Sequence, residues 1–235
     1  MIRVRECRLP DGRIFEVGED AADRILCGVV VMQDVRVDGS EGAAEETAAL
    51  APGLRDRYRG LQPSEIPALA PARALYKAFG MDPSRHRPSS EALLRRVLKG
   101  DDLYRINSAV DSCNLASLSF VLPIGMYDLD RVKGDVVLRV GADGESYPGI
   151  RKGPVNLGGR IGLFDAQGPF GSPTSDSART SVGEDTRAVL AVIMADGGFD
   201  PAAMAAHTDR FGEVFAVHCG ARPVFSAVLP RGGTP

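Results

Sequence analysis

The chain has 235 residues, of which 44% are hydrophobic and 25% charged, a composition typical of one globular protein. Its net charge of −3 argues against a protein that coats nucleic acid through bulk positive charge, although a local basic face is compatible with it. The longest nearly uncharged stretch, residues 114–126, is shorter than the roughly 20 residues of a membrane-spanning helix. Because the N-terminus also lacks the apolar core of a signal peptide, we expect a cytoplasmic protein that contacts neither membrane nor DNA.

Cysteine and histidine are sparse and scattered, which narrows the possible chemistry. No two cysteines form a C-x-x-C pair and no two histidines form an H-x-H or H-x-x-x-H pair, so the sequence predicts no metal site and no redox dithiol. Buried, unreactive thiols are the simpler interpretation, and we expect no cofactor. The residues concerned are Cys7, Cys27, Cys113, Cys219, His86, His207 and His218.

The first 80 residues predict strands followed by helices. Residues 13–17 and 25–37 are rich in β-branched side chains and predict two strands. The acidic, alanine-rich run 41–50 opens a helical pattern that continues to Gly60. A second helix is expected from Pro63 to residue 79, where apolar residues recur at helical spacing.

Residues 88–99 form the clearest helical pattern of the chain. Ser89 or Ser90 can cap the helix, Glu91 lies in its first turn, and Gly100 ends it. The densest basic cluster of the sequence lies on and before this helix, either as a solvated face or as a surface that contacts phosphates. It comprises Arg85, Arg87, Arg95, Arg96 and Lys99.

The second half of the chain alternates between strands and helices. Helices are expected over 107–118 and 201–217, strands over 135–140, 154–164, 187–194 and 224–229, a hairpin turn at 141–144 and a frayed tail at 231–235. With no internal repeat and no long linker, a single α+β domain spanning residues 1–235 is expected.

Residues 165–180 are the most unusual segment, because small, hydroxyl and acidic residues are concentrated there. We interpret the segment as a long loop in which Gly168 and Gly171 let the backbone approach a ligand and exposed amides hold an anion or an oxyanion. In the alternative interpretation, its polar side chains only satisfy its own backbone.

Asn107, Asp111 and Asn114 form a second polar group. Their spacing places them on one face if the segment is helical. They can bind a sugar or an amino group, or serve as caps and buried hydrogen-bond partners, and local reasoning does not decide between these roles.

The order of motifs resembles a known family. Residues 105–147, RINSAVDSCNLASLSFVLPIGMYDLDRVKGDVVLRVGADGESY, resemble the pattern N-x-x-V-D-x-x-N-Y, then G-Q-P-L-H-A-F-D-L-D, in the editing domain (B-three/B-four) of the phenylalanyl-tRNA synthetase beta subunit. RPSSEALLRR upstream and GPFGSPTSDSART downstream resemble freestanding relatives of that domain. The resemblance covers about residues 73–194. Gly125 stands where the synthetase motif has histidine, and we expect it to leave room there.

The resemblance implies a three-layer β-β-α sandwich and hydrolysis of the ester of a mischarged aminoacyl-tRNA. The partner is then the acceptor end of tRNA, which we expect to meet the basic cluster of residues 85–99. The resemblance also implies that the pocket is lined by residues 107–114, the 123–128 turn and residues 165–180. A non-catalytic tRNA-binding module, or a binder or hydrolase of a free amino-acid derivative, is the alternative. The amino acid, the tRNA and the oligomeric state are not determined by the sequence. The residues expected to act are Asp165, Thr174, Asp176 and Asn107 in catalysis, and Ser90, Asp111, Asn114, Gly125, Tyr127, Gly168, Gly171, Ser172, Ser177 and Arg179 in substrate binding.

Overall fold

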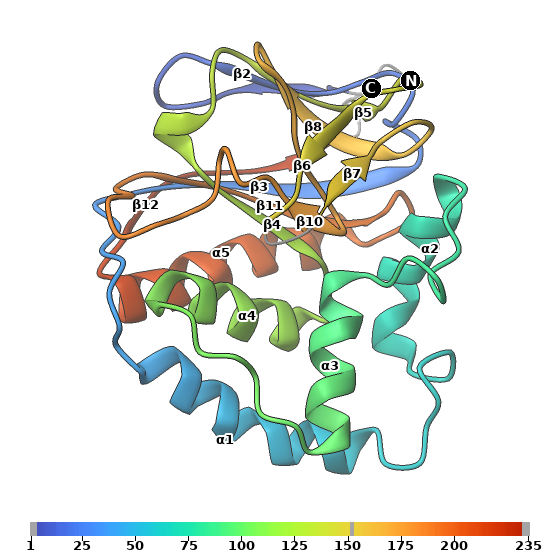
Figure 1. The fold of residues 1–235 in the computed structure, drawn as a ribbon, viewed down its shortest axis with the longest axis vertical. Coiled ribbons are helices and arrows are strands. Elements are labelled where there is room, and N and C mark those ends of the chain that lie inside the picture. The colour runs from blue at the N-terminus through green and yellow to red at the C-terminus, as the bar shows by residue number, and fades with distance from the viewer. Residues whose placement is uncertain (1–3, 151–152, 232–235) are drawn as a thin grey trace.

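The computed structural model describes residues 4–150 and 153–231 as three stacked layers. A six-stranded sheet packs on a four-stranded sheet, and helices cover the opposite face of the four-stranded sheet (Figure 1). The predicted α+β class and the β-β-α layering are therefore confirmed. No helix in the described part of the chain is long and apolar enough to cross a membrane.

The outer sheet has the strand order β1-β2-β5-β8-β9-β10. All neighbours are antiparallel except β2 and β5, which are parallel. Its strands are β1 (Glu6–Arg8), β2 (Ile14–Val17), β5 (Val136–Val140), β8 (Ile161–Asp165), β9 (Gly168–Ser172) and β10 (Ser175–Asp176). The short strand β10 therefore lies at one edge of this sheet.

The inner sheet is wholly antiparallel, with the order β12-β3-β11-β4. Its strands are β3 (Ile25–Gln33), β4 (Ile124–Asp128), β11 (Val189–Asp196) and β12 (Arg222–Leu229). The apolar runs in β3 and β11 are continuous because both faces of these strands are buried. Val29 and Val192 face the outer sheet, whereas Val30 and Ile193 face the helices.

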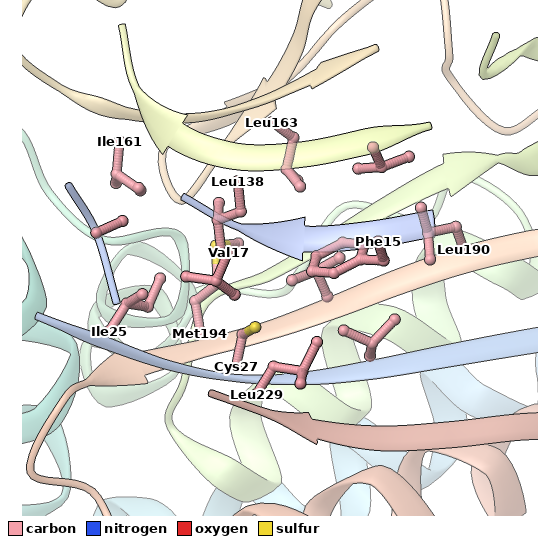
Figure 2. Packing of buried hydrophobic residues seen from close by; sticks show 14 of the residues in the cluster. Phe15, Val17, Ile25, Cys27, Leu138, Ile161, Leu163, Leu190, Met194 and Leu229 are labelled. Carbon is pink, nitrogen blue, oxygen red and sulfur yellow. The ribbon is translucent and has the colours of Figure 1, made fainter. Parts of the chain in front are cut away.

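The core between the two sheets is built by alternate residues of facing strands. Figure 2 shows Phe15, Val17 and Leu138 from the outer sheet packed over Cys27 and Met194 of the inner sheet. These five side chains are fully buried. Dense packing of this kind holds the two sheets in one relative position, and so defines where their edges meet.

The helical layer has two tiers. α4 (Ser108–Phe120) and α5 (Pro201–Cys219) lie on the inner sheet, and α1 (Gly42–Arg57) packs beneath α4 (Figure 1). α3 (Ser89–Lys99) packs against α1 and α4, and α2 (Ala70–Ala78) lies beside β11. Two short 3-10 helices, η1 (Pro67–Leu69) and η2 (Leu129–Arg131), complete the set.

Several local predictions were wrong for identifiable reasons. The segment 165–180 is not a structureless loop: it contains β9 and β10, and β9 pairs with β8 across a tight turn in which Gly168 has φ +110°. The helix expected from Pro63 begins at Pro67, after a turn in which the Gln62 amide donates to the Glu65 carboxylate. The turn near 141–144 forms, but β5 pairs with β2 and β8 rather than with the next strand.

The next strand, β6 (Ser146–Pro148), pairs instead with β7 (Pro154–Asn156) in a separate two-stranded ribbon. This ribbon lies beside β9 and brings Tyr147 to the edge of the outer sheet. The residues 232–235 of the expected tail lie outside the described part of the chain.

Candidate active site

The edge strands β10 and β4 of the two sheets lie side by side, and the candidate site is where they meet. Asp176 lies on β10, and Tyr127 lies on β4. Asp176 is partly exposed, whereas Tyr127 is completely buried. The site is therefore reached from solvent on the side of Asp176.

The ring of Tyr127 lies between two glycines, Gly125 on its own strand and Gly171 on β9. A Cβ atom placed on either glycine would lie 2.1 Å from the Tyr127 hydroxyl. The expectation that Gly125 leaves an open space was wrong, because the hydroxyl end of Tyr127 fills that space. Both predicted glycines thus shape the site by permitting the tyrosine to reach it.

The Tyr127 hydroxyl is buried and has no hydrogen-bond partner of good geometry among the described residues. Burial, and then the nearby Asp176 carboxyl, raise the pKa of Tyr127. The hydroxyl therefore acts on the Asp176 carboxyl rather than on solvent.

Asp176 titrates near neutrality. Burial raises the pKa of its carboxyl to about 7, and the Tyr127 hydroxyl and the Met126 backbone amide oppose that shift only in part. The charge of this carboxyl contributes to raising the pKa of two neighbouring groups, the Cys113 thiol on α4 and the Tyr147 hydroxyl on β6. A carboxyl with a pKa near the working pH is well suited to general-base catalysis.

Two tyrosines hold the turn between β9 and β10. The Tyr76 hydroxyl on α2 is 2.8 Å from the Thr174 hydroxyl, and the Tyr147 hydroxyl is 2.8 Å from the Ser172 hydroxyl. Tyr147 also donates to the Ser175 carbonyl. The predicted residues Thr174 and Ser172 are therefore within the site, and their hydroxyls hold the turn that carries Asp176.

A buried carboxylate next to Tyr76 organises the basic cluster. Glu91 is 1% exposed, and Arg73 lies 2.7 Å from it. Arg95 and Arg87 lie 3.6 and 4.0 Å from its other oxygen. The prediction that a serine caps α3 was wrong: Pro88 is at the cap position, and the Ser90 hydroxyl is buried without a partner among the described residues.

The five basic residues predicted to contact tRNA do not form one free surface. Arg87 and Arg95 face Glu91, and Arg96 donates to the Asp102 carbonyl while stacking on Tyr104. Arg85 and Lys99 are exposed at the two ends of this region. Any contact with phosphates would therefore be distributed rather than concentrated in one patch.

Asn107, Asp111 and Asn114 have different roles, although all three belong to α4 or its N-cap. Asn107 caps α4, and its side-chain oxygen accepts from the Val110 amide at 2.9 Å. Asp111 and Asn114 line a cavity of about 250 Å³ between α1, α4 and residues 101–105. Burial raises the pKa of Asp111. The structure thus gives Asn107 a structural role and places the other two in a cavity.

The remaining predicted residues lie around the β8–β9 hairpin. Arg179 binds both oxygens of Asp165, at 2.8 and 2.9 Å, and the Lys133 and Gln167 amides also donate to this carboxylate. Ser177 is buried, and its hydroxyl accepts from the Arg179 amide. No interaction in the described part of the chain joins this ion pair to Asp176, so the structure does not bring the two aspartates together.

Sequence reasoning missed Tyr147 and Cys113, which the fold brings to Asp176 from β6 and α4, and Tyr76, which reaches Thr174 from α2. The sequence holds five tyrosines and no tryptophan. The scarcity of tyrosine was the available signal in the sequence, but it does not indicate which tyrosines lie together in the fold. No group of three metal-binding side chains is present among residues 4–150 and 153–231.

Comparisons with known proteins agree with the resemblance found in the sequence. The family model described as the B3/4 domain matches residues 71–214, more than half of the chain. Among solved structures, an N-terminal fragment of the phenylalanyl-tRNA synthetase beta-subunit from Pyrococcus horikoshii is 14% identical, with a TM-score of 0.46. The match covers 92% of this chain and 53% of that fragment, so the chain spans about half of its length. No curated protein matches the sequence.

Proposed function

Because the chain belongs to the B3/4 domain family, and is thereby related to tRNA synthetases, we propose that it hydrolyses the ester bond of mischarged aminoacyl-tRNA in the cytoplasm. The observation that carries the proposal is the Asp176 carboxyl, whose pKa is raised to about 7 by burial beside the Tyr127 hydroxyl. The motif order of residues 105–147, which resembles an editing domain, supplies the reaction.

In the proposed reaction, Asp176 takes a proton from a water molecule that attacks the ester carbonyl. The new bond joins the water oxygen to the carbonyl carbon, and the bond from that carbon to the ribose oxygen breaks. Asp176 then gives that proton to the leaving ribose oxygen, and the released amino acid loses the second proton of the water to solvent as it becomes a carboxylate. An aminoacyl ester is already activated, so a positioned water and donors to the developing oxyanion can suffice.

The Tyr127 hydroxyl is buried beside Asp176 and partly opposes the rise of its pKa, so its proposed role is to orient this carboxyl. Thr174 has a different proposed role, because its hydroxyl is engaged by Tyr76 at 2.8 Å. It positions the turn before Asp176.

The test is deacylation of a panel of correctly and incorrectly charged tRNAs by the full chain. We expect selective hydrolysis of at least one charged species, a loss of at least about 100-fold in Asp176→Asn, and unchanged activity in the control Asp209→Asn. Asp209 is exposed on α5. After subtraction of spontaneous hydrolysis, the rate should rise with pH to a plateau, with a midpoint near 7.

No hydrolysis across a broad panel would overturn the proposal. Salt-dependent tRNA binding without turnover would then favour the binding module instead. Hydrolysis that Asp176→Asn leaves intact would retain the activity but remove Asp176 as its base.

A further inference from the structure

The cavity of about 250 Å³ lies within the helical layer, between α1, α4 and residues 101–105. α4 packs on the inner sheet and α1 packs beneath α4, so the cavity faces away from both sheets (Figure 1). Asp176 is not among the residues that line it. The cavity is therefore a site separate from the candidate active site.

One wall of the cavity is apolar and carries only small side chains. Ala44, Ala48 and Ala51 follow one face of α1 at helical spacing. Val97 of α3 and Leu103 add further apolar surface to the lining. The helix rises about 10 Å from Ala44 to Ala51. A wall of this length and smoothness suits a slender aliphatic chain.

Three carboxylates line the cavity from two different elements. Asp111 lies on α4, whereas Asp101 and Asp102 lie in the segment that follows α3. Asp111 is only 6% exposed; one of its oxygens accepts from the Ile106 amide at 3.2 Å, and the other has no partner among the described residues. Burial raises the pKa of Asp111, because it disfavours the charged form. A positively charged ligand would offset that cost.

The positively charged side chains of the lining already have acceptors in the protein. Arg105 forms an ion pair with Glu41, and Arg55 donates to the Val97 carbonyl at 3.4 Å. The Thr47 hydroxyl donates within its own helix. When Glu41 is included, four carboxylates face two guanidinium groups. The cavity therefore has an excess of two negative charges.

The carboxylates of the cavity do not converge on one point. No group of three side chains that could hold a metal ion is present among the residues that the structure describes. A ligand with two separated positive charges can instead reach Asp111 on one side and residues 101–102 on the other. An alkylammonium group carries three hydrogen-bond donors, for which carboxylates and the Asn114 side-chain oxygen are acceptors.

We propose that this cavity binds an aliphatic diamine, with one ammonium group between Asp111 and Asn114 and the other at residues 101–102. The methylene chain lies along the alanine wall of α1, and the two charges of the ligand neutralise the negative excess. The inference goes beyond the proposed function, because the cavity does not include Asp176. It holds whether or not the chain hydrolyses an ester.

Isothermal titration calorimetry of the full chain with putrescine, the four-carbon diamine, tests the proposal. Butylamine has the same chain and only one charge, butanediol has polar ends without charge, and Mg²⁺ carries the two charges at one point. We expect the Kd of putrescine to be lower than that of butylamine by about ten-fold or more. Butanediol and Mg²⁺ should show no saturable binding, and added salt should weaken the binding of putrescine.

Two variants with matched controls locate the site. Asp111→Asn can still accept from the Ile106 amide, and it should weaken putrescine binding about ten-fold or more. Its control, Glu45→Gln, removes an exposed carboxylate of α1 outside the cavity and should bind as the unaltered chain does. Ala48→Leu narrows the cavity and should also weaken binding. Its control, Ala49→Leu, adds the same side chain at the neighbouring exposed position, which does not line the cavity.

The absence of saturable putrescine binding at millimolar concentrations would overturn this inference, as would binding that either Asp111→Asn or Ala48→Leu leaves unchanged. Equal affinity for putrescine and butanediol, or for putrescine and Mg²⁺, would also overturn it, because the cavity would then not recognise two separated charges. None of these results depends on ester hydrolysis, so the proposed function stands or falls by its own assay.

Discussion

Replacing Asp176 with asparagine should remove activity and, at alkaline pH, stabilise the protein. Asparagine has nearly the same shape, can still accept from the Met126 amide and the Tyr127 hydroxyl, and carries no charge to bury. The unfolded carboxyl has its ordinary pKa of 3.8, and the folded one has a pKa of about 7. The folded state therefore holds a proton that the unfolded state has lost between these two pH values, so stability falls as pH rises from about 4 to 7.

The magnitude follows from the pKa difference. Each pKa unit corresponds to about 1.4 kcal/mol, and a shift from 3.8 to about 7 gives an upper bound of roughly 4 kcal/mol above pH 7. Asp176 is partly exposed, and solvent screening reduces this to about 2 kcal/mol. For a chain of this length, we expect Asp176→Asn to raise Tm by about 4–8 °C at pH 8.

Thermal unfolding at pH 8 and pH 5, followed by circular dichroism, tests this reasoning. At pH 5 the native carboxyl is already protonated, so most of the gain should disappear. The exposed control Asp209→Asn should change Tm little at either pH. A Tm that falls at pH 8, or a gain that is equal at both pH values, would refute the assignment of a buried, destabilising carboxylate to Asp176.

Three further predictions test the surroundings of the site. Gly125→Ala should destabilise the fold by about 1–3 kcal/mol in urea unfolding, because its Cβ would lie 2.1 Å from the Tyr127 hydroxyl. Adding Tyr127→Phe to this variant should restore part of the lost stability. Equal stability of Gly125→Ala and the unaltered chain would contradict this packing. Asn107→Ala should cost about 1 kcal/mol in the same measurement, whereas Asn107→Asp keeps the cap and should cost little; an unchanged midpoint in Asn107→Ala would exclude a capping role. Arg179→Met should lower the free energy of unfolding by about 2 kcal/mol, because it leaves the buried Asp165 carboxylate without its cation. Adding Asp165→Asn to this variant should recover stability. Purely additive losses of the two substitutions would count against the ion pair.

The sequence by itself determined most of the secondary structure and the α+β class. Continuous apolar runs of β-branched residues predicted β3 and β11, because strands buried on both faces need such runs. The helix pattern, first-turn Glu91 and Gly100 predicted α3 and its end, where Gly100 adopts φ +84°. These signals are local, so they can be seen without the fold.

The tertiary structure decided which polar residues act together. Asp165 and Asp176 are only eleven positions apart, yet Arg179 binds one in an ion pair while β4 and the tyrosines surround the other. The difference arises because β8 and β10 lie in the outer sheet with β9 between them, and only β10 reaches the edge strand of the inner sheet. The pKa of a carboxyl depends on such long-range burial.

Gly125 shows most directly what the sequence determines and what only the tertiary structure decides. The sequence showed that a side chain is absent at this position, and from this alone a vacant space was expected. In the folded chain Tyr127 fills that space, and its hydroxyl lies within 2.1 Å of where a Cβ would be. Side-chain volume is read from the sequence, but the occupant of the space it leaves is decided by the packing of neighbouring strands.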